Sequence, residues 1–387
     1  MILVYTSIRM NVGEQMKSFI KMILQVVRRL DYICLYVYFA IRYPINDKQI
    51  LFLSDSRETM TGNFYFISCS LDNSYTIKKH LYADAHIKHA KKNICKDMAT
   101  SHYIIIDDFC SYIYPIPLRK KTKLIQVWHA MGAFKTVGFA RKGNHDRFSM
   151  THRNYTDTIV SAPSIRKDYA KAFRMDMKNV HSIGIPRTDI FFNQDYISKK
   201  RKDIYLRYPM LKDKKVILFA PTFRGNNIHK AYYDFEKINF RELQERLPDN
   251  YMCIIKMHPF IQNTYLEELD SSFYLDLTHE REINDLLLIT DILITDYSSV
   301  IFEASLLNIH TLFYAYDLLE YTETRDFFYP YEEYTFGPVV YNEEELVNAI
   351  LYSHINEEKL MRFKEKFTIC CDGKATQRFI DTLLKEK

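Results

Sequence analysis

The tetrapeptide Asp-Tyr-Ser-Ser at 296–299 stands between two apolar stretches of different character. The run 291–295 is typical of a buried parallel strand, and 300–307 carries apolar residues at helical spacing. An Asp or Ser at such a junction can cap the new helix, while Ser hydroxyls and free backbone N–H groups can donate to an anion. The segment is therefore either an ordinary helix cap or a phosphate-binding turn, and its composition alone favours the cap.

Two histidines each follow an apolar run that is typical of a strand. His129 ends the run 124–129 beside the single Trp of the chain, Trp128, and His258 follows the run 251–256. Open parallel sheets bind ligands at the carboxyl ends of their strands, and an imidazole can accept a proton from a hydroxyl near neutral pH. A lone His is more often a structural residue, but the strand-end position favours a catalytic role for His129.

These side chains need elements that bring strand ends together. Strand-like runs alternate with helical stretches, so we expect an α/β fold of two doubly wound, Rossmann-like domains facing a cleft. The 387 residues exceed one average core, and the polar, basic stretch 193–213 indicates a domain boundary or a solvated helix. We therefore expect an N-terminal segment over 1–45 and domains over 46–205 and 206–387.

Local patterns in the first domain predict three strands and a helix. The strands are expected over 49–54, 64–71 and 102–107, and the helix over 78–96. After His129, Gly132 permits a tight turn into a further helix. The acidic pair Asp107 and Asp108 is interpreted as loop and cap residues, because no further carboxylate or His follows at the spacing of metal ligands.

Composition excludes several classes of function. A hydrophobic content of 47% with 26% charged residues is typical of a globular protein, and a net charge of +5 is too small to indicate nucleic-acid binding. The seven Cys form no Cys-x-x-Cys pair, which favours reduced thiols and no zinc site. No Gly-x-Gly-x-x-Gly follows a predicted strand, which counts against an NAD-dependent dehydrogenase.

The N-terminal segment 16–43 is apolar but interrupted by basic residues. Its uninterrupted apolar run is too short to span a bilayer, and no small-residue cleavage site of a signal peptide follows it. A helix that lies on the membrane, with its basic side chains at the lipid headgroups, fits this pattern. The alternative is a core helix of the first domain.

Six motifs together resemble the CDP-glycerol glycerophosphotransferases of teichoic acid synthesis, of the glycerol phosphate primase or polymerase type. They run in the family's order from about Gln49 to the C-terminus: Trp128-His129-Ala130 with Gly132 and Lys135, Gly184-Ile185-Pro186-Arg187-Thr188-Asp189, Ala220-Pro221-Thr222-Phe223-Arg224, Lys256-Met257-His258-Pro259, Thr295-Asp296-Tyr297-Ser298-Ser299 and Asp372-Gly373-Lys374-Ala375. Each motif is weak alone, and jointly they are specific. The resemblance implies a GT-B-like fold, peripheral attachment to the cytoplasmic face of the membrane, a CDP-activated polyol phosphate donor such as CDP-glycerol and a lipid-linked acceptor.

The resemblance also implies that His129 and His258 are the catalytic pair. We expect His129 to act as general base for an acceptor hydroxyl that attacks the phosphorus bearing glycerol, so that CMP leaves. No cofactor is expected to be required, although Mg2+ could assist, and protein donors must then offset the diphosphate charge. The residues expected to bind substrate are Thr222, Arg224, Lys256, Asp296, Ser298, Ser299, Glu303, Lys135 and Arg187. Glu303 would bind ribose hydroxyls, or else be a solvated helix carboxylate.

Two features depart from the polymerases of that family. Ala130 and Met131 stand where those enzymes often have Gly-Thr, and the polymerases carry extra sequence ahead of the transferase. A shorter chain of this His-Ala-x-Gly form resembles the primase-type members that add the first unit. The alternatives are a CDP-ribitol ribitolphosphotransferase, a GT-B glycosyltransferase that uses a sugar nucleotide, and a membrane-bound binding protein with a vestigial cleft.

Overall fold

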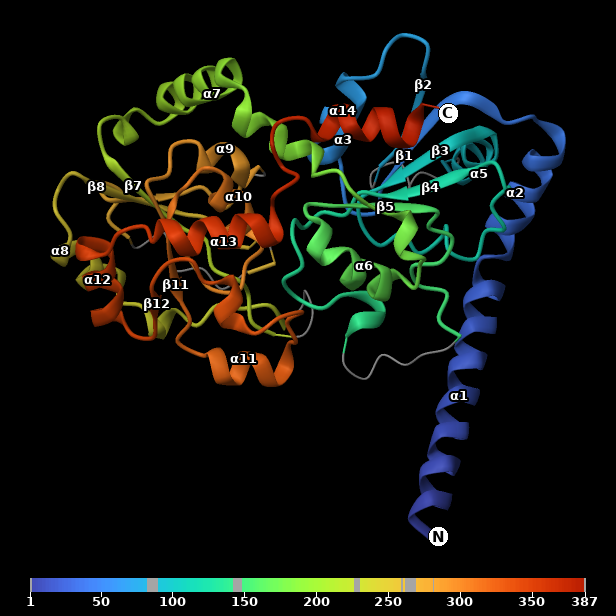
Figure 1. The fold of residues 1–387 in the computed structure, drawn as a ribbon, viewed down its shortest axis with the longest axis horizontal. Helices are drawn as coiled ribbons and strands as arrows, with labels where there is room; N and C mark the ends of the chain where they lie inside the picture. Colours follow the sequence, from blue (N-terminus) through green and yellow to red (C-terminus); the bar gives the residue numbers. More distant parts are fainter. Residues whose placement is uncertain are drawn as a thin grey trace. The chain divides into compact units, whose positions relative to one another are not determined.

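The computed structural model describes residues 2–81, 90–141, 148–225, 230–258, 260–261, 269–280 and 282–385, with side chains from residue 15 onward. The chain divides into two compact units (Figure 1). Unit 1 comprises Met1–His129, Thr136–Arg187 and Lys374–Lys387, and unit 2 comprises Ala130–Lys135 and Thr188–Gly373. The boundary was predicted near residue 205, whereas the chain passes from unit 1 to unit 2 between Arg187 and Thr188. The basic stretch that suggested the boundary forms helix α7 (Gln194–Arg207), with one fully buried residue, Ile204.

Unit 1 is built on a parallel sheet of six strands in the order β2-β1-β3-β4-β5-β6. The strands are β1 (Asn46–Leu53), β2 (Thr76–His80), β3 (Ser101–Ile106), β4 (Lys123–Gln126), β5 (Asp157–Val160) and β6 (Val180–Ser182). β3 is buried along its whole length, which explains its apolar run 103–106. The strand order reverses between β1 and β3, and in such sheets the crevice for ligands opens at the carboxyl ends of the strands beside that point.

Unit 2 is built on a second parallel sheet of six strands in the order β12-β11-β10-β7-β8-β9. The strands are β7 (Lys215–Phe219), β8 (Tyr251–Ile255), β9 (Tyr274–Asp276), β10 (Ile292–Thr295), β11 (His310–Tyr314) and β12 (Val339–Val340). The order reverses between β7 and β10, which pair in parallel through Leu218 and Leu293. The loops that carry Arg224 and Asp296 therefore leave the sheet at its switch point.

Helices lie between the strands along the chain. Those of unit 1 are α3 (Gly62–Cys69), α5 (Ala90–Thr100), α6 (Arg166–Phe173) and α14 (Ala375–Phe379), and those of unit 2 include α8 (Phe240–Arg246), α9 (Ile283–Leu287), α10 (Val300–Leu306), α11 (Leu318–Thr324), α12 (Glu343–Tyr352) and α13 (Glu357–Phe367). Of these, α12, α13 and α14 follow the last strand. The expected α/β architecture with two parallel sheets is thus confirmed.

Three local predictions in unit 1 are wrong. The run 64–71 was expected as a strand, but most of it forms α3, because a short apolar run does not distinguish a buried strand from a buried helix. The expected helix over 78–96 begins with β2 and ends with α5, and 82–89 lies outside the described residues. No helix follows Gly132 before the short 3-10 turn at Gly138–Ala140.

The N-terminal segment forms two helices with different surroundings. In α2 (Leu30–Arg42) the rings of Tyr32, Tyr36 and Phe39 are buried in unit 1, so this part follows the core-helix alternative. α1 (Ile2–Arg28) extends away from the sheet of unit 1 (Figure 1). No helix in the described ranges is both long and apolar enough to cross a bilayer.

Candidate active site

The loop that carries His129 leaves β4 in a strained conformation. Trp128 has a φ of 50°, in the left-handed region that side chains other than Gly seldom adopt. Gln126 is fully buried and compensates, since its Oε1 accepts a hydrogen bond from the Trp128 N–H at 2.9 Å. The sharp turn leaves the His129 side chain 47% exposed at the carboxyl edge of the sheet.

Asn63, at the start of α3, joins the His129 loop to the loop of Arg187. Its amide nitrogen donates to the carbonyls of Val127 and Trp128, and its Oδ1 accepts from the Arg187 N–H at 3.0 Å. The guanidinium of Arg187 in turn donates to the His129 carbonyl at 2.5 Å. The fold therefore brings the two predicted residues His129 and Arg187 together, through a fully buried Asn that the sequence analysis did not identify.

The two carboxylates after β3 have separate roles. Asp107 is buried and paired with Ser54 and Arg57, so it stabilises the switch point of the sheet. Asp108 Oδ1 lies 3.4 Å from His129 Nδ1 and also accepts from the Phe109 N–H. Burial raises the pKa of Asp108, but the contacts with His129, Phe109 and Ser56 together lower it more, so that the net pKa lies below the usual range. Asp108 is thus more than the loop residue that the sequence predicted.

In unit 2, Arg224 is the centre of a buried ionic network at the switch point. Its Nη1 donates to Asp296 at 2.9 Å, and its Nε and Nη2 donate to Asp317 at 2.5 and 2.8 Å. Because two carboxylates and the Thr222 carbonyl already bind the guanidinium, a substrate phosphate would have to displace one of them. The network suits a positioning role for Arg224 better than the predicted phosphate contact.

Asp296 connects the loops after β7 and β10 and does not cap α10. It is 1% exposed, and its Oδ1 accepts from the N–H groups of Thr222 and Tyr297. The half-buried Ser298 and Ser299 follow it and precede α10, and Ser298 Oγ accepts from the Val300 N–H. Both serines thus lie at the carboxyl edge of the sheet, as expected.

Two further predicted residues are buried beside this turn. Glu303 is 2% exposed, so the alternative of a solvated helix carboxylate is wrong. Thr222 is 5% exposed, and its hydroxyl has no hydrogen-bond partner in the part of the chain that the structure describes. A buried hydroxyl without a partner is unfavourable and marks a place where a polar ligand atom could bind.

His258 and Lys256 lie after β8 in different surroundings. The His258 ring packs against Phe223 with 4.7 Å between ring centroids, and its Nδ1 accepts from the Phe260 N–H. A neutral imidazole with Nδ1 as acceptor carries its proton on Nε2, which makes it a hydrogen-bond donor. Lys256 is buried and donates to the Thr278 carbonyl, and burial lowers its pKa.

The segment Ala130–Lys135 follows the His129 loop and belongs to unit 2. Gly132 has a φ of 68°, and a Cβ there would overlap the ring of Phe302. The Lys135 ammonium lies 5.4 Å from the centroid of the Tyr321 ring. Burial lowers the pKa of Lys135 to about 7, with Asp296 acting against this shift and Arg325 adding to it.

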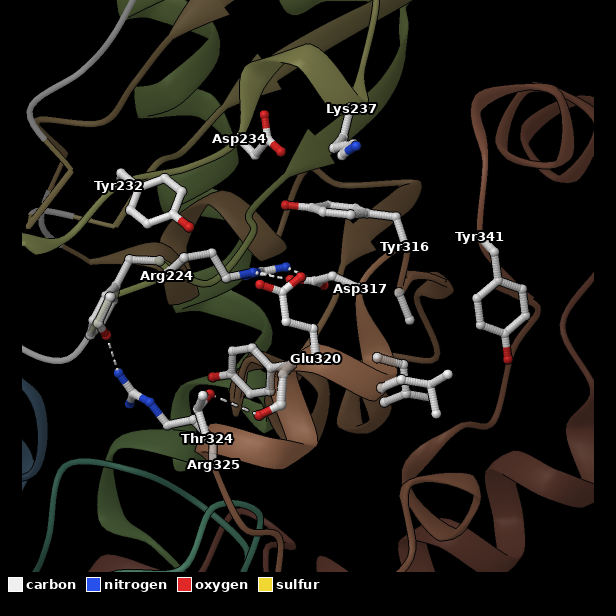
Figure 2. Close-up of a pocket in the computed structure, with 16 residues that line it drawn as sticks. Arg224, Tyr232, Asp234, Lys237, Tyr316, Asp317, Glu320, Thr324, Arg325 and Tyr341 are labelled. Atoms are coloured by element: carbon white, nitrogen blue, oxygen red, sulfur yellow. Dashed lines mark hydrogen bonds and ion pairs between the residues drawn. The ribbon is translucent and has the colours of Figure 1, made fainter.

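A cavity of about 780 Å³ opens beside Arg224 at the ends of β7 and β11 (Figure 2). Its lining includes the side chains of Tyr232, Asp234, Lys237, Tyr316, Glu320 and Arg325. None of these was identified from the sequence, because each stands in a loop or helix without a motif of its own. Among the described residues no group of three or more His, Cys, Asp or Glu is arranged to hold a metal ion.

The chain was compared with known proteins. Residues 35–385 match the family model described as CDP-glycerol:poly(glycerophosphate) glycerophosphotransferase. A teichoic acid poly(ribitol-phosphate) polymerase of Bacillus spizizenii is 42% identical over 351 residues, which are 88% of this chain and 57% of the polymerase. This chain belongs to the CDP-glycerol:poly(glycerophosphate) glycerophosphotransferase family. The predicted resemblance is confirmed.

Other relatives in this glycerophosphotransferase family show the range of similarity. A teichoic acid glycerol-phosphate primase of Bacillus subtilis is 33% identical over 297 residues, 74% of this chain and 75% of the primase. The structure of a variant of the wall teichoic acid polymerase TagF has a TM-score of 0.75 at 21% identity and covers 95% of this chain and 96% of its own. That likeness shows the fold alone, with the same two-sheet, GT-B-like architecture.

Proposed function

We propose that the protein transfers a polyol phosphate from a CDP-activated polyol to a hydroxyl of a lipid-linked acceptor in teichoic acid synthesis and releases CMP. Membership of the family supports the reaction class. The observation that carries the proposal is the contact of 3.4 Å between His129 and Asp108 at the carboxyl edge of the unit 1 sheet. A half-exposed imidazole backed by a carboxylate is the arrangement of a general base.

In the proposed step the acceptor oxygen attacks the phosphorus that bears the polyol. The new oxygen–phosphorus bond forms as the bond to the bridging oxygen of the diphosphate breaks, and CMP leaves with that electron pair. His129 takes the hydroxyl proton, and Asp108 holds the ring and stabilises the imidazolium. His258 would donate from Nε2 to the diphosphate, with Ser298 and Ser299 as further donors.

In this proposal, some of the remaining predicted residues contact the substrate and others hold the loops in place. Lys135 and Arg187 would offset phosphate charge, and Glu303 would bind the ribose. Asp296 and Arg224 would position the loops around the substrate and hold Thr222, while Lys256 would stabilise the loop before His258. No resident cofactor is needed for this step, and any Mg2+ would act by neutralising the diphosphate.

For the donor we favour CDP-ribitol over the CDP-glycerol that the motifs first suggested. The poly(ribitol-phosphate) polymerase shares 42% identity over 88% of this chain, against 33% over 74% for the glycerol-phosphate primase. The test is a panel of CDP-ribitol, CDP-glycerol and sugar nucleotides offered with a lipid-linked acceptor, with and without Mg2+. CMP release with CDP-ribitol is expected, whereas release of a nucleoside diphosphate from a sugar nucleotide would contradict the proposal.

We also propose that α1 attaches the protein to the cytoplasmic face of the membrane. Its exposed apolar side chains recur at spacings of three and four residues, and they are Met16, Phe19, Ile20, Ile23, Leu24 and Val27. Lys17, Lys21 and Arg28 lie on the same helix and would pair with anionic headgroups. A helix of this kind would bring the enzyme to a lipid-linked acceptor.

A further inference from the structure

The floor of the unit 2 cavity holds a guanidinium whose charge is already paired. Arg224 is paired with Asp296 and Asp317, so its single positive charge faces two carboxylates. Tyr297 adds a hydrogen bond from its hydroxyl to Asp317 at 3.0 Å. A phosphate group would gain little here, because the local charge is negative and the guanidinium is occupied. The floor therefore suits an uncharged ligand that carries hydroxyl groups.

Two tyrosine hydroxyls that line the pocket could form hydrogen bonds with such a ligand. Tyr316 and Tyr321 lie with their ring centroids 5.2 and 5.1 Å from the Arg224 guanidinium carbon. Both hydroxyls are buried, and neither has a hydrogen-bond partner within the described ranges. Tyr321 as a whole is only 3% exposed. Because buried hydroxyls are nearly always paired, these two indicate that polar ligand atoms complete the pocket.

Cationic side chains stand at the margins of the pocket. In Figure 2, Tyr316 and Asp317 lie between two cations. Lys237 is on one side of this pair, and Arg325 is on the other side. Arg325 uses one N–H to bind the Gly225 carbonyl at 2.6 Å, which leaves other N–H groups of its five for a ligand. Asp234 and Glu320 line the same pocket and can accept hydrogen bonds from ligand hydroxyls.

We propose that this pocket binds a phosphate–polyol–phosphate segment of the acceptor chain. The polyol hydroxyls would pair with Tyr316 and Tyr321, and the flanking phosphates would meet Lys237 and Arg325. This inference rests on the proposed function, since it assigns the acceptor chain of that reaction to this pocket. A pocket whose hydroxyl-lined centre disfavours phosphate and whose margins are cationic matches the alternation of charge along such a chain.

The test measures binding of a short, chemically defined oligo(ribitol phosphate) that carries no nucleotide. The Tyr316→Phe/Tyr321→Phe double variant removes only the two unpaired hydroxyls and keeps the packing of both rings. We expect it to bind the oligomer about tenfold more weakly than the wild type, as the loss of two hydrogen bonds predicts, and CDP within about twofold of the wild type. Tyr352→Phe, on a residue that is 72% exposed, is the matched control and should change neither affinity.

A second variant tests the margin of the pocket independently of the tyrosines. Lys237→Gln, on an exposed residue, should weaken oligomer binding about threefold, and Lys359→Gln, on an exposed residue of α13, should not. Unchanged oligomer affinity in the double variant, or an equal loss of CDP affinity, would overturn the inference. A wild type that releases no CMP with any donor would instead overturn the proposed function. If the wild type releases CMP and the double variant binds the oligomer normally, only this inference is refuted and the proposed function stands.

Discussion

The imidazole of His129 and the carboxylate of Asp108 form a pair whose members come from different strands. β3 delivers Asp108 and the adjacent β4 delivers His129, so their contact follows from strand pairing. In the proposed step, the carboxylate would stabilise the imidazolium that forms when His129 accepts a proton. Half exposure leaves the ring accessible to an acceptor hydroxyl.

Replacement of these two residues separates the base from its positioning partner. His129→Ala should lower kcat by about 10²- to 10⁴-fold, the usual contribution of a general base, while CDP affinity stays within about twofold. Asp108→Asn keeps the base and should lower kcat by a smaller factor. Steady-state CMP release and CDP titration measure both effects. His354→Ala, on an exposed residue, is the control, and near-normal turnover by His129→Ala would refute the assignment.

A second histidine of unit 1, His152, is buried near Trp128. Burial lowers its pKa to about 4, Arg141 adds to the shift, and Asp108 opposes it. The unfolded chain has a His pKa of about 6.5, so between pH 6.5 and 4 only the unfolded state binds this proton. The free energy of unfolding therefore falls as the pH falls through that window.

This linkage predicts how the stability of unit 1 changes with pH. From pH 7 to 5, His152 should cost unit 1 about 2 kcal/mol of unfolding free energy, measured by urea denaturation and Trp128 fluorescence. Trp128 is a local probe, since its ring centroid lies 6.1 Å from that of His152. His152→Asn tolerates the φ of 59° and should remove this pH dependence, whereas the exposed control His354→Asn should retain it.

At the scale of elements, α1 and α2 differ although both are apolar. The rings of α2 fill gaps in unit 1, where Tyr36 accepts a hydrogen bond from the Arg119 N–H and Tyr32 stacks on Tyr112. α1 instead leaves side chains such as Ile20 and Val27 about half exposed. An exposed apolar stripe of this length gains free energy only when another apolar phase covers it.

Substitution of that stripe tests the membrane proposal without disturbing the fold. The variant Ile20→Ser/Ile23→Ser/Leu24→Ser/Val27→Ser should partition into anionic vesicles more than about tenfold less than the wild type, because each apolar side chain inserted is worth about 1 kcal/mol or more. Vesicle sedimentation measures the partitioning. Leu206→Ser, on another exposed helical residue, should bind like the wild type. Unchanged sedimentation of the fourfold variant would show that α1 is not the anchor.

At the scale of the whole molecule, sequence order and unit membership differ at the C-terminus. The chain leaves unit 2 at Gly373 and returns to unit 1, where α14 and the π-helical turn Ile380–Leu384 pack. Arg378 donates to the Ile183 carbonyl, and Tyr103 donates to the Leu384 carbonyl. The last helix thus stabilises the first sheet.

Matched core substitutions test which unit each C-terminal helix supports. Phe379→Ala, at a fully buried site of unit 1, should lower the unfolding free energy reported by Trp128 fluorescence by about 3–5 kcal/mol. Phe367→Ala removes an equally buried ring of unit 2 and should leave the Trp128 transition unchanged. It should still lower the stability of the helices when unfolding is followed by circular dichroism. Equal effects of both variants on the Trp128 signal would contradict this division.

The sequence by itself determined the parts of the structure that depend on local pattern. Apolar runs followed by polar residues located β4, β8 and β10 and placed His129, His258 and the serine turn at strand ends. The periodicity of apolar residues depends only on residues that are close in the sequence, so it can be recognised from the sequence alone. It failed for α3, where the short, mostly apolar run 64–71 fits either a buried helix or a buried strand.

Only the tertiary structure decided which of these side chains meet and what each can do. Asp108 lies beside His129, Asn63 joins two loops, and Arg224 is held by Asp317 from 93 residues away. Such contacts depend on strand order and loop geometry, which no local pattern encodes. The pocket of unit 2 arises in the same way, from loops that the order of β7, β10 and β11 brings together.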